Sequence, residues 1–356
     1  MKKNRIRVFL GGYVNFLNAQ NINCRALSEH LDKKRFEVWT MLYWYQNAKD
    51  FQRMPGVHYL WSRRPVRFLG WLPYFIGILR CDIAYLPKGE YDRLCWRLAK
   101  LSGCRLFTTL EGVLDDELLS RQKNIDKYIN HFRLFEPHLY SITRFMACME
   151  KQNHGLLCEE KILYLGSETE RFLKDPHEVD AFGNVVMIGN DLNRKKAAEF
   201  IQMASLFPQM TFHIVGGNDI NGLKIEDYIT KAGISNITYH GLLDHAQLSS
   251  LLVDMDLMYF PSRSEGFPKV MLETACAGVP TLCYGDYGAN EWITTGKDGF
   301  VVNTFEEAKT VIQSLIDHPE RLQELSRNAI ELGKRFDWKV LVKDWEEEII
   351  IMMSEK

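Results

Sequence analysis

Short apolar runs alternate with amphipathic stretches along the whole chain. In the first half we predict strands at 5–10, 37–42, 83–86, 105–110, 139–142 and 162–165, and helices at 18–31, 91–102 and 144–154. The second half repeats the scheme, with strands predicted at 184–188, 211–215, 237–239, 257–259 and 281–283. Strands separated by crossover helices are typical of parallel sheets with helices on both faces. The pattern therefore predicts an α/β fold with two doubly wound sheets.

A charged segment, residues 166–182, separates the two series and contains Asp175-Pro176, which is typical of a linker. The length of 356 residues also favours two domains, at about 150 residues per domain. We predict a first domain at 1–167 that is completed by an amphipathic C-terminal helix, 338–356. The second domain is predicted at 168–337.

The composition narrows the class of protein. Hydrophobic residues make up 46% and charged residues 25%, which is globular and excludes disordered and fibrous chains. The eight cysteines form no C-x-x-C pair and no zinc spacing, and no cleavable signal peptide is visible, so we expect a reduced, cytoplasmic chain. The apolar stretch 68–79 is shorter than the ~20 residues that a spanning helix needs. It could lie on a membrane without crossing it.

The most informative stretch reads PSRSEGFPKVMLE, from Pro261 to Glu273. A strand ends just before it, a glycine-containing loop follows, and a helix is expected from Lys269. The carboxyl ends of strands and the free amides of helix N-termini are where doubly wound sheets bind nucleotides. Two carboxylates in this position, Glu265 and Glu273, can accept hydrogen bonds from the hydroxyls of a sugar and of a ribose.

This stretch resembles the E-x7-E signature of retaining, nucleotide-sugar-dependent glycosyltransferases of family four, which have the GT-B fold. Flanking segments resemble other motifs of the family: Ile214 to Gly217, Tyr239 to Gly241, Gly288 to Glu291 and Gly296 to Val302. The resemblance implies two Rossmann-like doubly wound domains facing an interdomain cleft. It also implies that the first domain binds the acceptor and the second binds the nucleotide-sugar donor.

Carried over residue by residue, the resemblance implies that Glu265 holds hydroxyls of the donor sugar and that Glu273 holds the ribose. The backbone at Gly266, Phe267, Pro268, Lys269 and Val270 would face the sugar and the diphosphate. Gly216, at the end of a strand, and Leu243, where relatives hold the base, complete the expected donor site in this region. As isolated residues, both glutamates would be read as ordinary surface carboxylates.

A second cluster, Asn190 to Lys196, directly follows the first strand of the second domain. Cations there would neutralise a leaving diphosphate. The family pattern is G-R-L-x-x-x-K-G, and Lys195 matches its lysine, whereas Asn190 replaces the arginine and Lys196 the glycine. Either Arg194 or Lys196 could supply the second charge. The alternative interpretation is a solvated start to a helix predicted at 195–207.

In the first domain, Gly12 follows the predicted first strand and resembles the family's glycine loop, although two glycines equally suit a tight turn. The segment Thr108 to Gly112 stands where many relatives carry T-x-H-G, so that Glu111 occupies the position of the histidine. Three roles remain open for Glu111: orienting the acceptor hydroxyl, taking its proton, or capping the next turn.

No metal-ligand spacing is found among the histidines, and Asp254-x-Asp256 precedes a buried strand, so we predict no metal and no other cofactor. The net charge of −2 conceals an asymmetry. Residues 1–167 carry 26 basic and 16 acidic side chains, or +10, and residues 168–356 carry 18 and 30, or −12. Together with the arginines and aromatic residues of segment 61–80, the basic half predicts peripheral contact with the inner face of the cell membrane. Nucleic acid is not expected, because no binding module is recognisable.

The predicted function is transfer of a sugar from a UDP- or GDP-linked donor to an acceptor hydroxyl, on a lipid-linked or surface polysaccharide glycan. The catalytic residues would be Glu265, Lys195 and Glu111. An alternative is a non-catalytic partner or regulator that binds nucleotide sugar, which the changes at Asn190 and Glu111 leave open. An epimerase on the same scaffold would need an acid/base set that the sequence does not offer.

Overall fold

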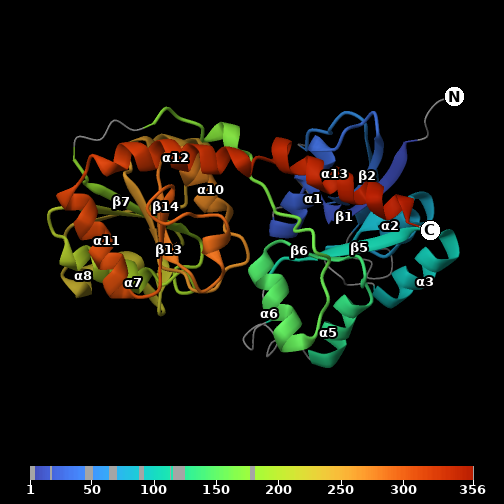
Figure 1. The fold of residues 1–356 in the computed structure, drawn as a ribbon, viewed down its shortest axis with the longest axis horizontal. Coiled ribbons are helices and arrows are strands. Elements are labelled where there is room, and N and C mark those ends of the chain that lie inside the picture. The colour runs from blue at the N-terminus through green and yellow to red at the C-terminus, as the bar shows by residue number, and fades with distance from the viewer. Residues whose placement is uncertain are drawn as a thin grey trace. The chain divides into compact units, whose positions relative to one another are not determined.

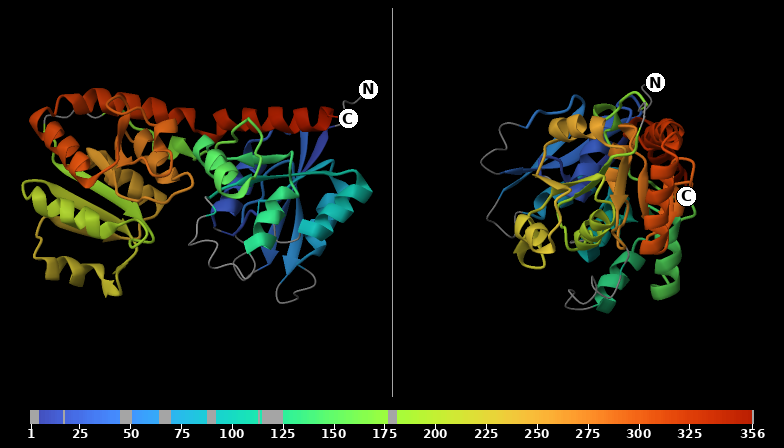
Figure 2. Two further views of the ribbon diagram at one scale, coloured as in Figure 1. Left: turned by 60° about the horizontal axis from the view of Figure 1, so that its bottom comes forward. Right: turned by 90° about the vertical axis from the view of Figure 1, so that its left-hand side faces the viewer.

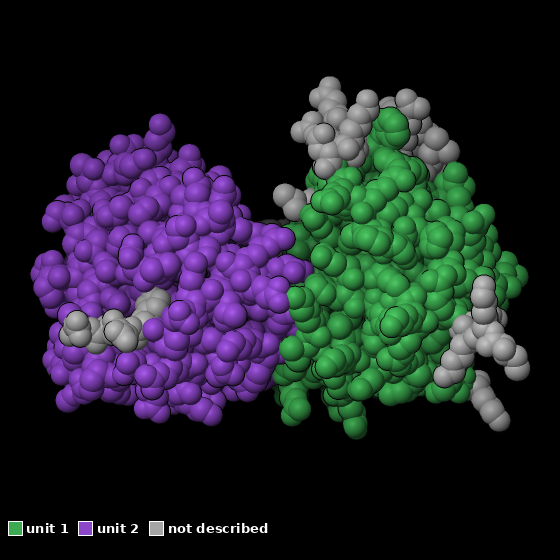
Figure 3. Space-filling view, turned by 90° about the horizontal axis from the view of Figure 1, so that it is seen from above, with its two compact units in different colours: residues 1–166, 338–356 green, residues 167–337 purple. Residues whose placement is uncertain are grey.

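A computed structural model describes residues 5–16, 18–44, 51–63, 70–87, 92–112, 114, 125–176 and 181–355. Contacts between Cα atoms divide the chain into two compact units (Figures 1 and 3). Unit 1 comprises Met1–Gly166 and Trp338–Lys356, and unit 2 comprises Ser167–Asp337. The boundary therefore lies one residue before the position that the sequence indicated.

Unit 1 is built on a parallel sheet of six strands in the order β3-β2-β1-β4-β5-β6. Its strands are β1 (Ile6–Tyr13), β2 (Phe36–Trp44), β3 (Val57–Arg63), β4 (Ile83–Tyr85), β5 (Arg105–Leu110) and β6 (Leu139–Ser141). Its helices are α1 (Ala19–His30), α2 (Leu72–Arg80), α3 (Asp92–Ser102), α5 (Ile125–Arg133), α6 (Arg144–His154) and α13 (Trp338–Ser354). Capping side chains begin two of them, with Asn18 accepting from the Asn21 amide and Thr143 from the Met146 amide.

Unit 2 repeats this topology, with a six-stranded parallel sheet in the order β11-β8-β7-β12-β13-β14. Its strands are β7 (Asn184–Gly189), β8 (Thr211–Gly216), β11 (Ile237–Gly241), β12 (Leu257–Phe260), β13 (Thr281–Tyr284) and β14 (Gly299–Val302), besides a small hairpin of β9 (Asp219–Ile220) and β10 (Leu223–Lys224). Its helices are α7 (Ala197–Leu206), α8 (Ile225–Ala232), α9 (His245–Leu251), α10 (Lys269–Cys276), α11 (Phe305–Asp317) and α12 (Arg321–Arg335). Every residue of β12 and β13 is buried, as expected for strands covered on both faces.

Several elements escaped the sequence prediction, among them β3, α5, α8, α11 and β14. Strand β3 lies at the edge of its sheet, and its sequence VHYLWSR mixes apolar with polar residues, so it has no continuous apolar run. Conversely, the strand predicted at 162–165 does not form, and only an isolated bridge between Ser141 and Ile162 is present there. The predicted linker is also not independent, because Ser167 and Thr169 hydrogen-bond to Phe336 and Asp337 within unit 2.

The C-terminal helix α13 packs on unit 1, along one side of its ribbon in Figure 2. The Trp345 ring lies 5.3 Å from Tyr85 and 6.4 Å from Phe107, and its indole N–H donates to the Tyr164 carbonyl at 3.1 Å. The next residue, Glu346, accepts from the Asp32 amide at 2.7 Å and from Arg35 at 3.0 Å. Among the described residues, no helix combines the length and the apolar character needed to cross a membrane.

Replacing Trp345 by alanine tests how much α13 contributes to unit 1. Trp345 is 1% exposed, so Trp345→Ala should lower the free energy of unfolding of unit 1 by about 3–5 kcal/mol, because it leaves a large cavity. Urea denaturation followed by circular dichroism measures this. Ile351→Ala, on the same helix but 49% exposed, should change stability by about 0.5 kcal/mol or less. Equal losses in the two variants would contradict this account of the packing.

Candidate functional site

Glycines allow the chain to pack closely at the carboxyl ends of β7 and β8. A Cβ added to Gly216 would lie 1.9 Å from the Gly189 carbonyl oxygen, and one added to Gly217 would lie 2.1 Å from that of Asn190. Gly216 also has a φ of +133°, which side chains rarely tolerate. Gly216, predicted to touch the donor, thus has a packing reason of its own: it brings the two strand ends together.

The segment after β7 turns tightly before α7 begins. The Lys195 amide donates to the Asp191 carbonyl at 3.0 Å, and the Arg194 amide donates to the Asp191 side chain at 3.1 Å. Lys196, the residue before α7, is left-handed with a φ of 58°. The glycine that the family pattern carries at this place would adopt that conformation without strain. The sequence placed the helix start at Lys195, two residues too early.

Glu265 accepts hydrogen bonds from three side chains at a single oxygen. Its Oε1 accepts from Lys195 Nζ at 2.7 Å, from Arg194 Nη1 at 3.0 Å and from the hydroxyl of Ser262. We call these four residues, Arg194, Lys195, Ser262 and Glu265, the Glu265 cluster. The side chains of Glu265 and Lys195 are only 7% and 10% exposed, whereas that of Arg194 is 45% exposed. Within the described residues, no hydrogen bond to Oε2 of Glu265 is found, so this oxygen is left to accept from a ligand.

The environment of Lys195 affects its charge. Burial lowers the pKa of the Lys195 ammonium, and the adjacent Glu265 carboxylate opposes that shift. The ammonium also lies 4.4 Å from the centre of the Phe260 ring, which favours a cation. The stem of Lys195 lies against Gly189, where a Cβ would come within 2.8 Å of its Cγ. The end of β7, Lys195 and the Glu265 carboxylate are thus packed against one another.

A second arginine holds the loop that carries Glu265. The Arg263 guanidinium lies 3.7 Å from the centre of the Tyr284 ring and donates to Asp286 at 3.0 Å. Beneath it, the hydroxyls of Tyr284 and Tyr259 both donate to Glu199 on α7. The loop after β12 is therefore tied to the segments after β7 and β13.

At two positions of the loop between Gly266 and Val270, Phe267 and Pro268, the side chain is buried and only the main chain could contact a ligand. Phe267 is 9% exposed, and its ring packs on Trp292 at 4.9 Å and on Phe336 at 5.3 Å. Pro268 is buried as well and has no N–H to donate. Pro268 could therefore make the predicted donor contact only through its carbonyl group or its ring. Lys269 and Val270 are the first two residues of α10.

Glu273 lies in the middle of α10, as the sequence indicated. Its Oε1 accepts from the hydroxyl of Ser167 at 3.0 Å. Ser167 is 5% exposed and pairs with Asp337 in an isolated bridge, so it fixes the position of this carboxylate. The structure brings Glu273 into no hydrogen bond with Glu265, and the two carboxylates have separate partners.

The other predicted donor residues of unit 2 are placed as follows. Leu243 is partly exposed and precedes Asp244, whose side chain caps α9 together with Gln247. Asn190 lies on the turn after β7, where its carbonyl approaches Gly217. Asp256 accepts from the amides of Gly183 and Asn184, which gives the Asp254-x-Asp256 pair a structural role.

The two predicted residues of unit 1 lie at the carboxyl edge of its own sheet. Glu111 follows β5 and accepts from the Tyr85 hydroxyl at 3.0 Å and from the Asn23 amide group at 3.2 Å. Gly12 was predicted to follow the first strand, but it lies within β1. A Cβ there would come within 2.7 Å of Cys24 on α1, so close helix packing requires this glycine.

Comparison with known proteins shows what unit 2 is similar to. Residues 169–332 match the family of glycosyl transferases group 1. The matched range contains the whole Glu265 cluster and Glu273. The chain is 26% identical over 185 residues to the N,N'-diacetylbacillosaminyl-diphospho-undecaprenol alpha-1,3-N-acetylgalactosaminyltransferase of Campylobacter jejuni, over 51% of this chain and 48% of that protein. The matches span about a third to a half of the length of the first curated relatives.

Solved structures of glycosyltransferases share the fold over nearly the whole chain. Sucrose-phosphate synthase of Thermosynechococcus elongatus has a TM-score of 0.78 at 14% identity, covering 98% of this chain and 100% of that one. Anabaena Alr3699/HepE, in complex with UDP and glucose, has a TM-score of 0.76 at 18% identity, with the same coverage. The predicted GT-B fold of two Rossmann-like domains is confirmed.

Sequence reasoning left several residues of this region without a role. Ser262 and Arg263 were part of the quoted motif, and Ser167 was assigned to the linker. Ser262 lies three residues before Glu265, close enough to bond it, which was the one local signal available. The partners of Arg263 and Ser167 are 23 and 106 residues away in sequence, and no local pattern indicates them.

The left-handed backbone at Lys196 gives a stability test. Lys196→Gly should raise the free energy of unfolding by about 0.5–1 kcal/mol, because the strain of a left-handed side chain exceeds the added freedom of glycine in the unfolded chain. Urea denaturation of unit 2, followed by fluorescence, measures the change. Lys196→Ala keeps the strained Cβ and should bring no gain. A similar gain for alanine and glycine would refute the assignment of strain to this position.

Proposed function

We propose that the protein is a retaining glycosyltransferase that moves a sugar from a UDP- or GDP-linked donor to an acceptor hydroxyl, without a metal. The observation that carries this proposal is the Glu265 cluster. It lies in the unit that matches group 1 glycosyltransferases, at the carboxyl ends of β7 and β12. Such strand ends are the usual ligand-binding edge of a doubly wound sheet.

The charge of the cluster suits a diphosphate. One carboxylate, Glu265, faces two cations, Lys195 and Arg194, which leaves one positive charge in surplus. Arg194 is the cation that reaches Glu265, so we assign the second charge to Arg194 rather than to Lys196. A preorganised positive group stabilises the negative charge that develops on a departing diphosphate.

In the proposed transfer, the bond between the anomeric carbon and the diphosphate oxygen breaks, and the diphosphate keeps the electron pair. The acceptor oxygen bonds to the anomeric carbon on the same face, and its proton passes to the leaving diphosphate. Oε2 of Glu265 would accept from hydroxyls of the donor sugar, and Glu273 from those of the ribose. Amides of Gly266, Phe267, Lys269 and Val270 would contact the sugar and diphosphate.

For the acceptor we propose a lipid-linked or surface polysaccharide glycan. The name of the Campylobacter jejuni relative gives that protein a diphospho-undecaprenol acceptor, which supports a lipid-linked one here. Glu111 would orient the acceptor hydroxyl from the carboxyl edge of unit 1. Peripheral contact with the inner face of the membrane would use α2, where Trp71, Leu72 and Leu79 are exposed. Arg64, Arg67 and Phe68, which belong to the same predicted contact, lie outside the described residues.

Release of nucleoside diphosphate tests the proposal. With UDP- and GDP-sugars in turn, the wild type should release UDP or GDP, and Glu265→Gln should slow the release by on the order of 10²-fold or more, because a preorganised group is lost. A coupled assay follows the release with and without EDTA. Glu306→Gln, on exposed α11, is the matched control and should act like the wild type.

Other outcomes of this assay would contradict the proposal. Tight nucleotide-sugar binding without turnover on any acceptor would indicate a binding partner or regulator. A strict need for a divalent cation would refute the metal-independent mechanism. Equal activity of Glu265→Gln and Glu306→Gln would remove Glu265 from the site.

The lowered pKa of Lys195 predicts an alkaline loss of affinity for UDP or GDP. As pH rises through that pKa, Lys195 loses its charge and one charge-assisted contact to the diphosphate, so binding should weaken by about 10-fold. Because burial lowers the pKa, the loss should come at a lower pH than for an exposed lysine. Isothermal titration calorimetry between pH 7.5 and 10 measures it.

Arginine keeps its charge over that range, so Lys195→Arg should abolish the alkaline loss. Lys309→Arg, at an exposed pair on α11, should leave the pH profile as it is in the wild type. A loss of the same size in Lys195→Arg would show that another group titrates.

A further inference from the structure

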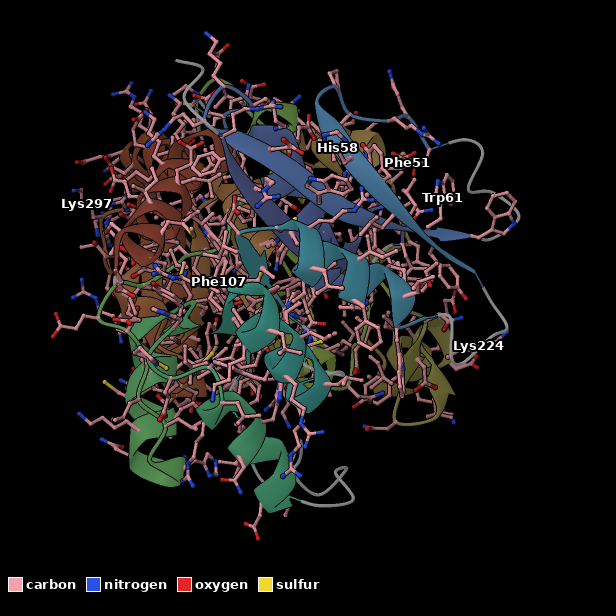
Figure 4. The ribbon with its side chains drawn as sticks, turned by 90° about the vertical axis from the view of Figure 1, so that its right-hand side faces the viewer. Phe51, His58, Trp61, Phe107, Lys224 and Lys297 are labelled. Carbon is pink, nitrogen blue, oxygen red and sulfur yellow. The ribbon has the colours of Figure 1, made fainter. Side chains whose placement is uncertain are left out.

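A row of aromatic side chains follows the edge strand of the sheet in unit 1. Tyr59 and Trp61 lie two residues apart on β3 and therefore point to the same face. Phe51, just before β3, lies 6.1 Å from Tyr59, and Trp44, at the end of β2, lies 5.3 Å from Trp61. We call these four residues the aromatic strip. Figure 4 labels Phe51 and Trp61 beside this outer strand.

The strip lies on the face of the sheet opposite to α2. His58 directly precedes Tyr59 on β3, and its ring stacks on Trp39 at 4.5 Å. The guanidinium group of Arg80, on α2, lies 5.5 Å from the same Trp39 ring. Because neighbouring residues of a strand point to opposite faces, Tyr59 and Trp61 point away from α2. Phe51 is accordingly covered by Arg25 of α1, at 5.6 Å.

Two guanidinium groups lie over the rings of the aromatic strip. Arg53 lies over both Tyr59, at 5.8 Å, and Trp61, at 5.6 Å, while Arg25 lies over Phe51. Both arginines are exposed, and within the described ranges neither forms an ion pair with a carboxylate. Residues 1–167 carry ten more basic than acidic side chains, 26 against 16. Among the described residues, no carboxylate pairs with these two guanidinium groups.

The indoles of the strip are unusually accessible. Trp44 is 51% exposed and Trp61 is 42% exposed. Large aromatic side chains gain free energy when a partner covers them, and Trp, Tyr and Arg dominate the energetics of recognition surfaces. An exposed row of them indicates a surface that a ligand covers.

We propose that the aromatic strip binds an anionic oligosaccharide, which under the proposed function is the acceptor glycan. The face of a sugar ring presents C–H groups that suit the negative face of an aromatic ring. Guanidinium groups bind carboxylate or phosphate substituents in a bidentate manner. Rings and guanidinium groups lie next to one another beside the edge strand β3, which matches a linear chain of acidic sugars better than a lipid surface.

The position of the strip fits an acceptor. Trp44 ends β2 at the same edge of the sheet where Glu111 follows β5, because all six strands are parallel. In the strand order, β3 lies four strands from β5, which is about 19 Å at about 4.8 Å per strand. A glycan held by the strip would therefore have to continue along this edge of the sheet for its terminal hydroxyl to reach Glu111. Only the identification of the glycan as the acceptor rests on the proposed function, because binding itself is independent of catalysis.

Binding of defined oligosaccharides tests the proposal. Octasaccharides of hyaluronan, polygalacturonate and polysialic acid are the anionic probes, and maltooctaose is the neutral one. Titration calorimetry should detect binding of at least one anionic probe and weaker binding of maltooctaose. Arg53→Ala and Trp61→Ala should each weaken it by about 10-fold, the loss of one desolvated cation–π or stacking contact. Arg80→Ala and Trp71→Ala, near α2 on the other face, should bind like the wild type.

Three results would overturn the proposal: no anionic probe binds, the α2 variants lose as much as the strip variants, or maltooctaose binds as well as the acidic chains. Vesicles with anionic lipids form a separate arm. Vesicle binding that depends on Arg53 and Trp61, without oligosaccharide binding, would make the strip a lipid contact instead. Diphosphate release by the wild type is measured in parallel. Release without glycan binding refutes only the strip, and glycan binding without release refutes only the proposed transfer.

Discussion

One oxygen of Glu265 joins segments that lie about 70 residues apart in the sequence. Lys195 and Arg194 come from the turn after β7, whereas Ser262 and Glu265 come from the loop after β12. A buried ion pair is weak evidence for stability, because desolvating both charges costs about as much as their attraction returns. Removing Glu265 alone would leave Lys195 buried without its carboxylate. The pair therefore fixes the position of the carboxylate more than it adds to net stability.

The backbone around this cluster is adapted to the same end. Gly189 leaves room for the stem of Lys195, and Gly216 leaves room for the carbonyl of Gly189. Without these glycines the ends of β7 and β8 could not approach, and the lysine could not turn back toward Glu265. Arg263 fixes the opposite side of the loop through Tyr284 and Asp286. Glycines and arginine together hold the carboxylate in place before any ligand arrives.

Unit 1 has the same strand order but a different surface. Its sheet carries Glu111 at the carboxyl edge and the aromatic strip along β3, and its last helix, α13, comes from the far end of the chain. Trp345 and Glu346 bind that helix to the sheet and to α1's neighbouring loop. Two units of one topology can thus serve different ligands, because function depends on side chains at the edges and not on the order of strands.

The sequence by itself determined the parallel α/β class and most of the buried strands, because continuous apolar runs such as 83–86 and 257–259 leave little alternative. It also indicated the loop around Glu265, the position of Glu273 on its helix, and the glycine-like site at Lys196. It did not indicate β3, whose half-exposed residues form no apolar run, or the place of Gly12 within β1.

Only the tertiary structure decided which charges meet. Three contacts join residues that are distant in sequence: Arg194 with Glu265, Arg263 with Asp286, and Ser167 with Glu273. Local sequence patterns do not indicate such contacts. The aromatic strip was hidden for the same reason: Trp44, Phe51, Tyr59 and Trp61 come from separate segments. They become one surface only when β3 pairs with β2 at the edge of the sheet.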